Sequence, residues 1–283
     1  MLRLITLSLA AAAICALSLA CGTGADPEPT PTPALESTPT PGPPTATAFP
    51  AFTPTPILSA GTAIVVGGDL RVRSAPSTQS EVVKTIEDHG AVTIAEAVQG
   101  ENWLVGAQTW VAKPPDWTRT WFRLSDGTFV YAAFVFILQP GEVSPLDDPA
   151  GGEKWIDVNV TAQTATAMVG DRAVYTALVS TGAPDFPSPI GTHHIESDGR
   201  VVLERMTASQ AGYAPNQARY DVERVLFTQY YDLNGDALHL NYWRAKEVFG
   251  RTATSHGCVG MQLHDAQYFW LFGEAGIRVE IHT

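Results

Sequence analysis

The chain has 283 residues, of which 45% are hydrophobic, and its 17 basic and 29 acidic residues give a formal net charge of -12. This length allows about two domains once terminal segments are set aside, and the hydrophobic content is sufficient for real cores. The acidic balance argues against a nucleic-acid-binding surface, and anionic lipid would repel the folded part.

The first 21 residues predict an export signal. Arg3 precedes an apolar run at 4–20 that is short for a membrane span. The run ends in Ala20 and Cys21, which resembles the end of a bacterial lipoprotein signal, where Cys21 would become the lipidated first residue. Ser18 departs from this pattern, because leucine is usual at that position. The alternative is that Cys21 follows an ordinary signal or an uncleaved anchor.

Residues 22–60 predict an extended linker. From Asp26 to Pro56, 11 of 31 residues are proline with threonine between them, so the segment cannot bury a core. In polyproline geometry the linker would span on the order of 120 Å. We therefore expect an extracytoplasmic protein, lipid-anchored through Cys21 to the outer face of the cytoplasmic membrane, whose folded part reaches the cell wall.

Residues 61–140 predict a small all-β unit, because short β-rich runs alternate with turn residues as in a barrel of short strands. Its distinctive residues are the run DLRVRSAPS at 69–77, Glu81-Val82-Val83, Trp103, Trp121 and the run DGTFVY at 126–131. Together they resemble a bacterial SH3-like domain, and the resemblance implies cell-wall peptide or polysaccharide as ligand. A spacer barrel with buried aromatic residues is the alternative. The segment 106–120 is expected to be an insertion, and the sequence assigns it no role.

Residues 141–152, which are rich in glycine and proline, predict a second short linker. Beyond it, residues 153–283 predict a second domain that is mainly β. Its first strand is expected at 155–160, where apolar and polar residues alternate. A hairpin is expected at 164–179, with its turn at 169–171.

A second hairpin in this domain matters most for function. Two β-prone runs flank Asn234-Gly235, a strong signal for a tight turn, so His239 would lie on a strand that aims its side chain with little freedom. Helical spacing behind Asp265 predicts one main helix, and alternation at 277–281 predicts a closing strand.

Cys258 is the candidate nucleophile. It is the single cysteine after residue 21, and an exported protein cannot use one unpaired thiol for an internal disulfide. The thiol is therefore either buried and idle or reactive. Gly257 beside it leaves room for a substrate carbonyl and leaves backbone N–H groups free to face a developing oxyanion. His239 and His256 are candidates to accept the thiol proton.

The neighbouring residues have less direct roles. Ser255 is expected to hydrogen-bond within the loop, His256 to shape that loop, and His264 to be a surface or helix-start residue. His239, His256, Cys258 and His264 could also supply metal ligands. Because His256 and Cys258 are crowded and no second cysteine follows, we expect no metal and no cofactor.

A longer pattern resembles the active-site signature of the L,D-transpeptidases, the YkuD-type catalytic domain. It consists of His239, fifteen intervening residues and then the run SHGCV at 255–259. Further similar positions are the run KWIDV at 154–158, STG at 180–182, PIGT at 189–192 and FG at 249–250. The resemblance covers 153–283 and implies a β-rich cysteine enzyme. Such an enzyme would form an acyl-enzyme with a peptidoglycan stem tetrapeptide and transfer the acyl group to an amine, which crosslinks the cell wall.

Two residues depart from the family pattern. Gly260 stands where the family usually has Asn or Arg, which puts the substrate preference in doubt. Leu240 stands where Gly or Ser is usual. Because that position orients the histidine in the family through its backbone carbonyl, Leu240 is expected to do the same. The acceptor stays open between a stem peptide, water and a protein amine, and a catalytically silent wall-binding lipoprotein is the alternative function.

Overall fold

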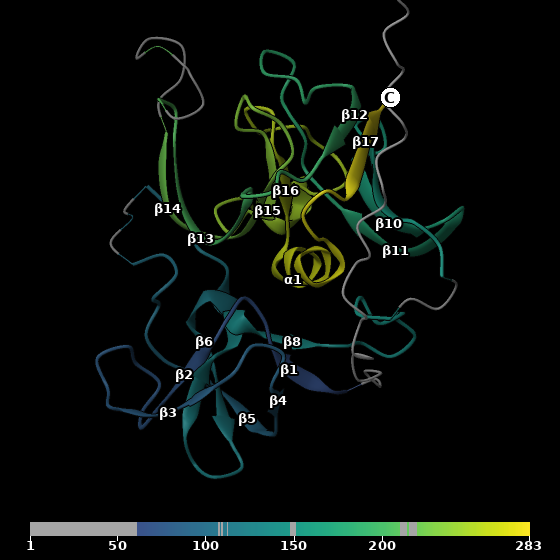
Figure 1. Cartoon of the computed structure of the whole chain (residues 1–283). Coiled ribbons are helices and arrows are strands. Elements are labelled where there is room, and N and C mark those ends of the chain that lie inside the picture. Colours follow the sequence, from purple (N-terminus) through teal and green to yellow (C-terminus); the bar gives the residue numbers. More distant parts are fainter. Residues whose placement is uncertain are drawn as a thin grey trace, which may run out of the picture. The chain divides into compact units, whose positions relative to one another are not determined.

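The structure is a computed structural model, and it describes residues 61–106, 108, 110–111, 113–147, 151–209, 214 and 220–283. The predicted signal, the lipidation site Cys21 and the predicted linker 22–60 lie outside the described residues. The described part is mainly β with one α-helix, as the sequence predicted (Figure 1).

The first eight strands form two sheets of antiparallel pairs, ordered β4-β1-β8 and β3-β2-β7-β6-β5. In β2, Leu70 and Val72 are buried while Arg71 is exposed, which is the two-residue period of a strand with one face on a core. Whether these sheets form an SH3-like domain stays a prediction. The strands are β1 Ala63–Val65, β2 Leu70–Arg73, β3 Val82–Ile86, β4 Ala91–Val92, β5 Ile94–Gln99, β6 Thr120–Leu124, β7 Phe129–Tyr131 and β8 Val135–Ile137, with 3-10 turns η1 Asp116–Arg119 and η2 Ala132–Phe134.

The remaining strands form a five-stranded sheet, β11-β10-β9-β17-β12, and a four-stranded sheet, β13-β14-β15-β16. Each contains one parallel pair, β17 with β9 and β15 with β16. The elements are β9 Lys154–Asn159, β10 Thr164–Val169, β11 Arg172–Leu178, β12 Gly191–His194, β13 Arg200–Thr207, β14 Asp221–Tyr230, β15 Ala237–Leu240, η3 Lys246–Val248, β16 Val259–Met261, α1 Leu263–Phe272 and β17 Arg278–His282.

The expected elements of this second region are present. β10 and β11 pair antiparallel, as do β14 and β15, so both hairpins predicted from the sequence are confirmed. His239 lies on β15, the predicted helix is α1 with Asp265 in its first turn, and β17 closes the chain.

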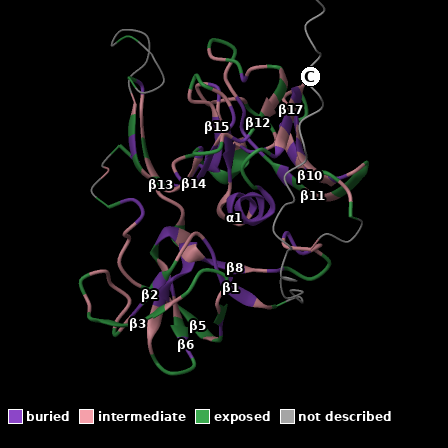
Figure 2. Cartoon of the chain, in the orientation of Figure 1, coloured by how far each residue is buried: buried purple, intermediate pink, exposed green. Residues whose placement is uncertain are grey.

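The helix α1 is buried along almost its whole length, which Figure 2 shows in purple. It contacts β14 and β15, and it also contacts β8. Gln267 Nε2 donates to the carbonyl oxygens of Ala133 and Val135 at 2.9 and 3.2 Å, and the Tyr268 hydroxyl donates to Val143 O at 2.9 Å. The helix therefore buries polar side chains because the backbone of residues 133–143 satisfies them.

His264, expected to be a surface or helix-start residue, lies in the first turn of α1 but is only partly exposed. Its ring stacks on Phe136 at 5.1 Å, and its Nε2 is 2.9 Å from Glu142 Oε1. Glu142 belongs to the predicted linker 141–152, so this segment contacts the helix. The domain boundaries themselves stay predictions.

Candidate active site

The register of β15 with β16 brings the candidate catalytic residues together. In this parallel pair, His239 is opposite Gly260 and Leu238 is opposite Val259. Because paired residues point to the same face and successive residues to opposite faces, His239, Asn241 and Gly260 share one face. Cys258, one residue before β16, shares it too. Two segments far apart in the sequence thus present a histidine and a cysteine to the same side.

That side opens into a cavity of about 1020 Å³. His239, Ser255, His256 and Cys258 all line it, so the structure brings together four of the residues predicted from the sequence. The other lining residues are Trp110, Met206, Thr207, Ala208, Ser209, Tyr220, Asp221, Val222, Asn241, Trp243, Arg244 and Thr254.

His239 is buried at 3% exposure and held in one orientation. Its Nδ1 lies 2.8 Å from the Leu240 carbonyl oxygen, so Nδ1 carries the proton and Nε2 is left as the acceptor. The contact expected at Leu240 is therefore present. The ring also stacks on Trp243 at 5.6 Å. Burial lowers the pKa of His239 to about 4, although the bond to Leu240 opposes this, so the imidazole is neutral at neutral pH and its Nε2 carries no proton.

Cys258 is a half-buried free thiol, with Sγ 3.8 Å from the Gly235 carbonyl oxygen. Burial raises the pKa of Cys258 to about 12, and the nearby carboxyls of Asp236 and Asp232 add to the rise. The resting site therefore holds a thiol and a neutral imidazole. The thiol proton has to leave as the sulfur attacks, because the free site does not favour a thiolate.

The loop before Cys258 is tied by its own polar groups. The Ser255 hydroxyl donates to the Cys258 carbonyl oxygen at 2.5 Å, and the Gly257 N–H donates to Ser255 Oγ at 3.2 Å. Ser188 Oγ donates to the Gly257 carbonyl oxygen at 2.5 Å. Ser255 thus makes the loop hydrogen bonds expected from the sequence, whereas the Gly257 N–H is already engaged by Ser255.

Gly257 is required by space and by backbone conformation. Its φ is +122°, in the region that favours glycine, and a Cβ there would collide with the Asp236 carboxyl group. Burial, and then repulsion from Asp232, raise the pKa of Asp236 to about 7. Asp236 was not among the residues predicted from the sequence, although it directly follows Asn234-Gly235 and precedes the first residue of β15.

Residues 153–281 match the family model of the L,D-transpeptidase catalytic domain. The matched segment contains both His239 and Cys258. Comparison with curated proteins gives no match.

Solved structures of L,D-transpeptidases are also similar to this chain. An L,D-transpeptidase from Mycobacterium smegmatis has 14% identity and a TM-score of 0.43, covering 81% of this chain and 100% of that one. The LD transpeptidase LdtMt1 in complex with imipenem has 18% identity and a TM-score of 0.43, covering 58% of this chain and 66% of that one, just under two thirds. L,D-transpeptidase 3 from Mycobacterium tuberculosis in complex with a faropenem-derived adduct has 18% identity and a TM-score of 0.40, covering 68% and 93%.

His256 lies in the matched segment between two aromatic rings, Phe186 at 4.7 Å and Tyr220 at 4.8 Å. Burial and the Arg244 charge lower the pKa of His256. These packing contacts fit the expected role in shaping the loop. In the described part of the chain, no group of three histidine, cysteine or acidic side chains is placed to hold a metal ion.

The segment 106–120, to which the sequence assigned no role, reaches the cavity of this domain. The rings of Trp110 and Trp243 meet edge to face at 6.3 Å, and Trp243 stacks on His239. Gln108 Nε2 donates to the Tyr242 hydroxyl at 2.6 Å. The two tryptophans were missed because nothing in their local pattern distinguishes a cavity wall from a buried core.

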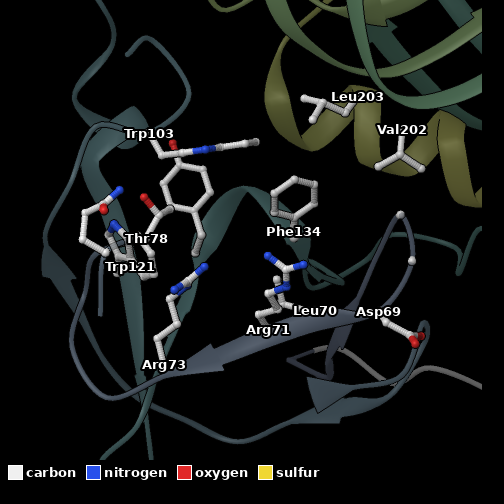
Figure 3. A pocket seen from close by; sticks show the side chains of 14 residues that line it. Asp69, Leu70, Arg71, Arg73, Thr78, Trp103, Trp121, Phe134, Val202 and Leu203 are labelled. Carbon is white, nitrogen blue, oxygen red and sulfur yellow. The ribbon is translucent and has the colours of Figure 1, made fainter. Parts of the chain in front are cut away.

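A second cavity, of about 570 Å³, lies between the region of the first eight strands and Val202 and Leu203 of β13 (Figure 3). Arg71 and Arg73 project into it from β2, and Trp103 and Phe134 line it with aromatic surface. Arg73 Nη1 donates to the Ser80 carbonyl oxygen at 2.8 Å, while the Arg71 side chain is exposed. Its lining residues include neither a cysteine nor a histidine, so it is not a second copy of the site at Cys258.

Proposed function

We propose that the chain is a peptidoglycan L,D-transpeptidase that uses Cys258 as nucleophile and His239 as general base. The observation that carries the proposal is that one cavity of the matched domain is lined by a free thiol and by a neutral imidazole whose Nδ1 is fixed. A cysteine and an oriented histidine that face one cavity are the groups that nucleophilic acyl transfer requires.

In the first step, Cys258 Sγ attacks the carbonyl carbon of a donor stem peptide as its proton passes to His239 Nε2. The carbon–sulfur bond forms while the carbonyl π electrons move to oxygen. Collapse of this tetrahedral intermediate breaks the carbon–nitrogen bond, and His239 returns the proton to the leaving D-amino acid. The product is a thioester on Cys258.

In the second step, an amine of a second stem peptide attacks the thioester. His239 takes a proton from the attacking nitrogen, and the new amide forms as the carbon–sulfur bond breaks. The proton then returns to the sulfur, which restores the resting thiol. Its raised pKa favours this last transfer, because a buried thiolate beside carboxyl groups is unstable.

The oxyanion of each step needs a hydrogen-bond donor. The Gly257 N–H already donates to Ser255 Oγ, so we assign the oxyanion to the backbone N–H of Cys258. Gly257 and Ser255 then support the oxyanion by holding the loop, and the carbonyl of Leu240 keeps His239 in its reactive tautomer.

We place this activity outside the cytoplasmic membrane. The apolar start, Cys21 and the proline-rich segment 22–60 support an exported, lipid-anchored enzyme whose folded part reaches the wall. Residues 61–140 would bind the wall, and the cavity with Arg71 and Arg73 offers a guanidinium for a carboxylate, which stem peptides carry.

The decisive experiment is incubation with purified stem tetrapeptides followed by intact-mass measurement. We expect an adduct of the donor minus its terminal D-residue on Cys258, absent in Cys258→Ala and consumed when an amine acceptor is added. If no tetrapeptide donor gives an adduct while a small electrophile still modifies Cys258, the silent wall-binding lipoprotein becomes the better function.

A further inference from the structure

The carboxamide of Asn241 is a buried polar group without a complete set of partners. Asn241 is 4% exposed, follows β15 by one residue and lines the cavity that holds His239 and Cys258. Its Oδ1 has no hydrogen-bond partner among the residues that the structure describes. Buried side-chain oxygens are nearly always paired, and of the unpaired buried side-chain atoms in the described residues only Asn241 Oδ1 belongs to a residue that lines this cavity, which marks its carboxamide as a candidate partner for a ligand.

The space around this carboxamide exists because Gly260 has no side chain. A Cβ at Gly260 would lie 2.7 Å from Asn241 Nδ2. Gly260 has no positive φ, so its backbone does not require glycine. Gly260 departs from the family pattern by lacking a polar side chain. The Asn241 carboxamide, which follows the neighbouring strand β15, occupies the space that such a side chain would take.

We propose that Asn241 is a specificity-determining residue that hydrogen-bonds a peptide group of the acyl donor. A carboxamide offers one acceptor and one donor group, which match the N–H and C=O of a peptide unit. Residues 258 and 260 are two positions apart, roughly 6.6 Å in strand geometry. An extended donor covers this distance in about two residues, so a peptide group near the attacked carbonyl reaches Asn241.

The inference rests on the proposed function, and a binding measurement tests it without catalysis. In a Cys258→Ala background, a synthetic stem tetrapeptide is titrated into the protein with Asn241 intact and into the Asn241→Leu variant by calorimetry. We expect the Kd to rise about tenfold in Asn241→Leu, since a peptide hydrogen bond in a buried site is lost. An unchanged Kd would overturn the proposal.

Thermal unfolding separates this role from a structural one. Asn241→Leu removes an unpaired oxygen at similar volume, so the midpoint of unfolding is expected to stay the same or rise while binding weakens. A fall in the midpoint together with unchanged binding by the remaining folded protein would mean that Asn241 serves the fold alone.

A reciprocal swap gives the sharpest control. Gly260→Asn alone crowds Asn241, and Asn241→Gly alone removes the carboxamide, so each is expected to raise the Kd about tenfold. Combining them returns one carboxamide to the same space and should bring the Kd back to within about threefold of the parent. A double variant no better than either single one would contradict the assignment.

Acylation kinetics distinguish failure of this inference from failure of the proposed function. If the unmodified protein is never acylated but the Cys258→Ala protein binds the tetrapeptide through Asn241, the proposed function fails and the assignment stands. If acylation proceeds with the same kcat/KM in Asn241→Leu, the assignment fails and the proposed function stands. Absence of both binding and acylation overturns the two together.

Discussion

The Asp236 carboxyl group occupies the space into which any side chain at position 257 would project. The two residues come from different segments, the turn before β15 and the loop before β16, and their contact fixes how closely Cys258 approaches that turn. The glycine that precedes Cys258 thus has a specific physical cause.

The first prediction concerns Gly257→Ala. The new methyl group meets the Asp236 carboxyl group in a positive-φ backbone, so we expect loss of thioester formation by at least about 100-fold and a lower midpoint of thermal unfolding. Gly276→Ala is the matched control, since Gly276 also has a positive φ of +85° but open space around it. It should cost only about 1–2 kcal/mol of backbone strain and leave acylation unchanged.

The second prediction concerns Asp236→Asn and pH. The pKa of Asp236 is raised to about 7, so the folded state holds this proton more tightly than the unfolded state. The contribution of Asp236 to stability should therefore fall as pH rises from about 4 to about 7, and the Asp236→Asn variant should differ from the parent by that contribution to the slope of the unfolding midpoint. Without the carboxylate, the pKa of Cys258 should also fall, seen as faster alkylation above about pH 8. Identical alkylation profiles would contradict this coupling.

The third prediction concerns His239. Its pKa is lowered to about 4, so between about pH 6.5 and pH 4 the unfolded state binds a proton that the folded state does not. The contribution of His239 to stability should fall as pH drops through this window, opposite in sign to that of Asp236, and His239→Gln should remove it. General-base catalysis is worth about 100- to 10,000-fold, so acylation by a tetrapeptide should slow by this order. An acylation rate within threefold of the parent would remove His239 from the mechanism.

The fourth prediction concerns the cavity of Figure 3. Arg71→Ala should lower the affinity for purified peptidoglycan, measured by co-sedimentation, about tenfold, because a charged partner for a carboxylate is lost. Arg123→Ala is the control: its guanidinium is also on the first eight strands, but it pairs with Glu96 at 2.8 Å and does not line the cavity. Equal loss in both variants would indicate a general charge effect.

The sequence predicted those parts of the site that depend on local signals. The turn signal at Asn234-Gly235 predicted that His239 lies on a strand. Gly257 and the single thiol of Cys258 indicated that 255–258 is the candidate site loop. These signals are short-range, so one sequence is sufficient to detect them. The roles assigned to these residues stay predictions until they are tested.

The sequence could not supply the contacts made between distant segments. Asp236 against Gly257, Asn241 against Gly260 and Trp110 against Trp243 each join residues whose neighbourhood depends on strand pairing. The ionisation states follow the same rule. A free thiol ordinarily has a pKa near 8.5, and only the folded position of Cys258, buried and next to Asp236, shows that its pKa is raised to about 12.

The contacts of helix α1 have a practical consequence for preparing the protein as separate fragments. Gln267 and Tyr268 use the backbone of residues 133–143 as their hydrogen-bond partners, and His264 uses Glu142. A recombinant fragment that begins at Glu153 would expose the surface of α1 that contacts residues 133–143, and we expect it to aggregate. Purification should therefore keep residues 61–283 in a single polypeptide.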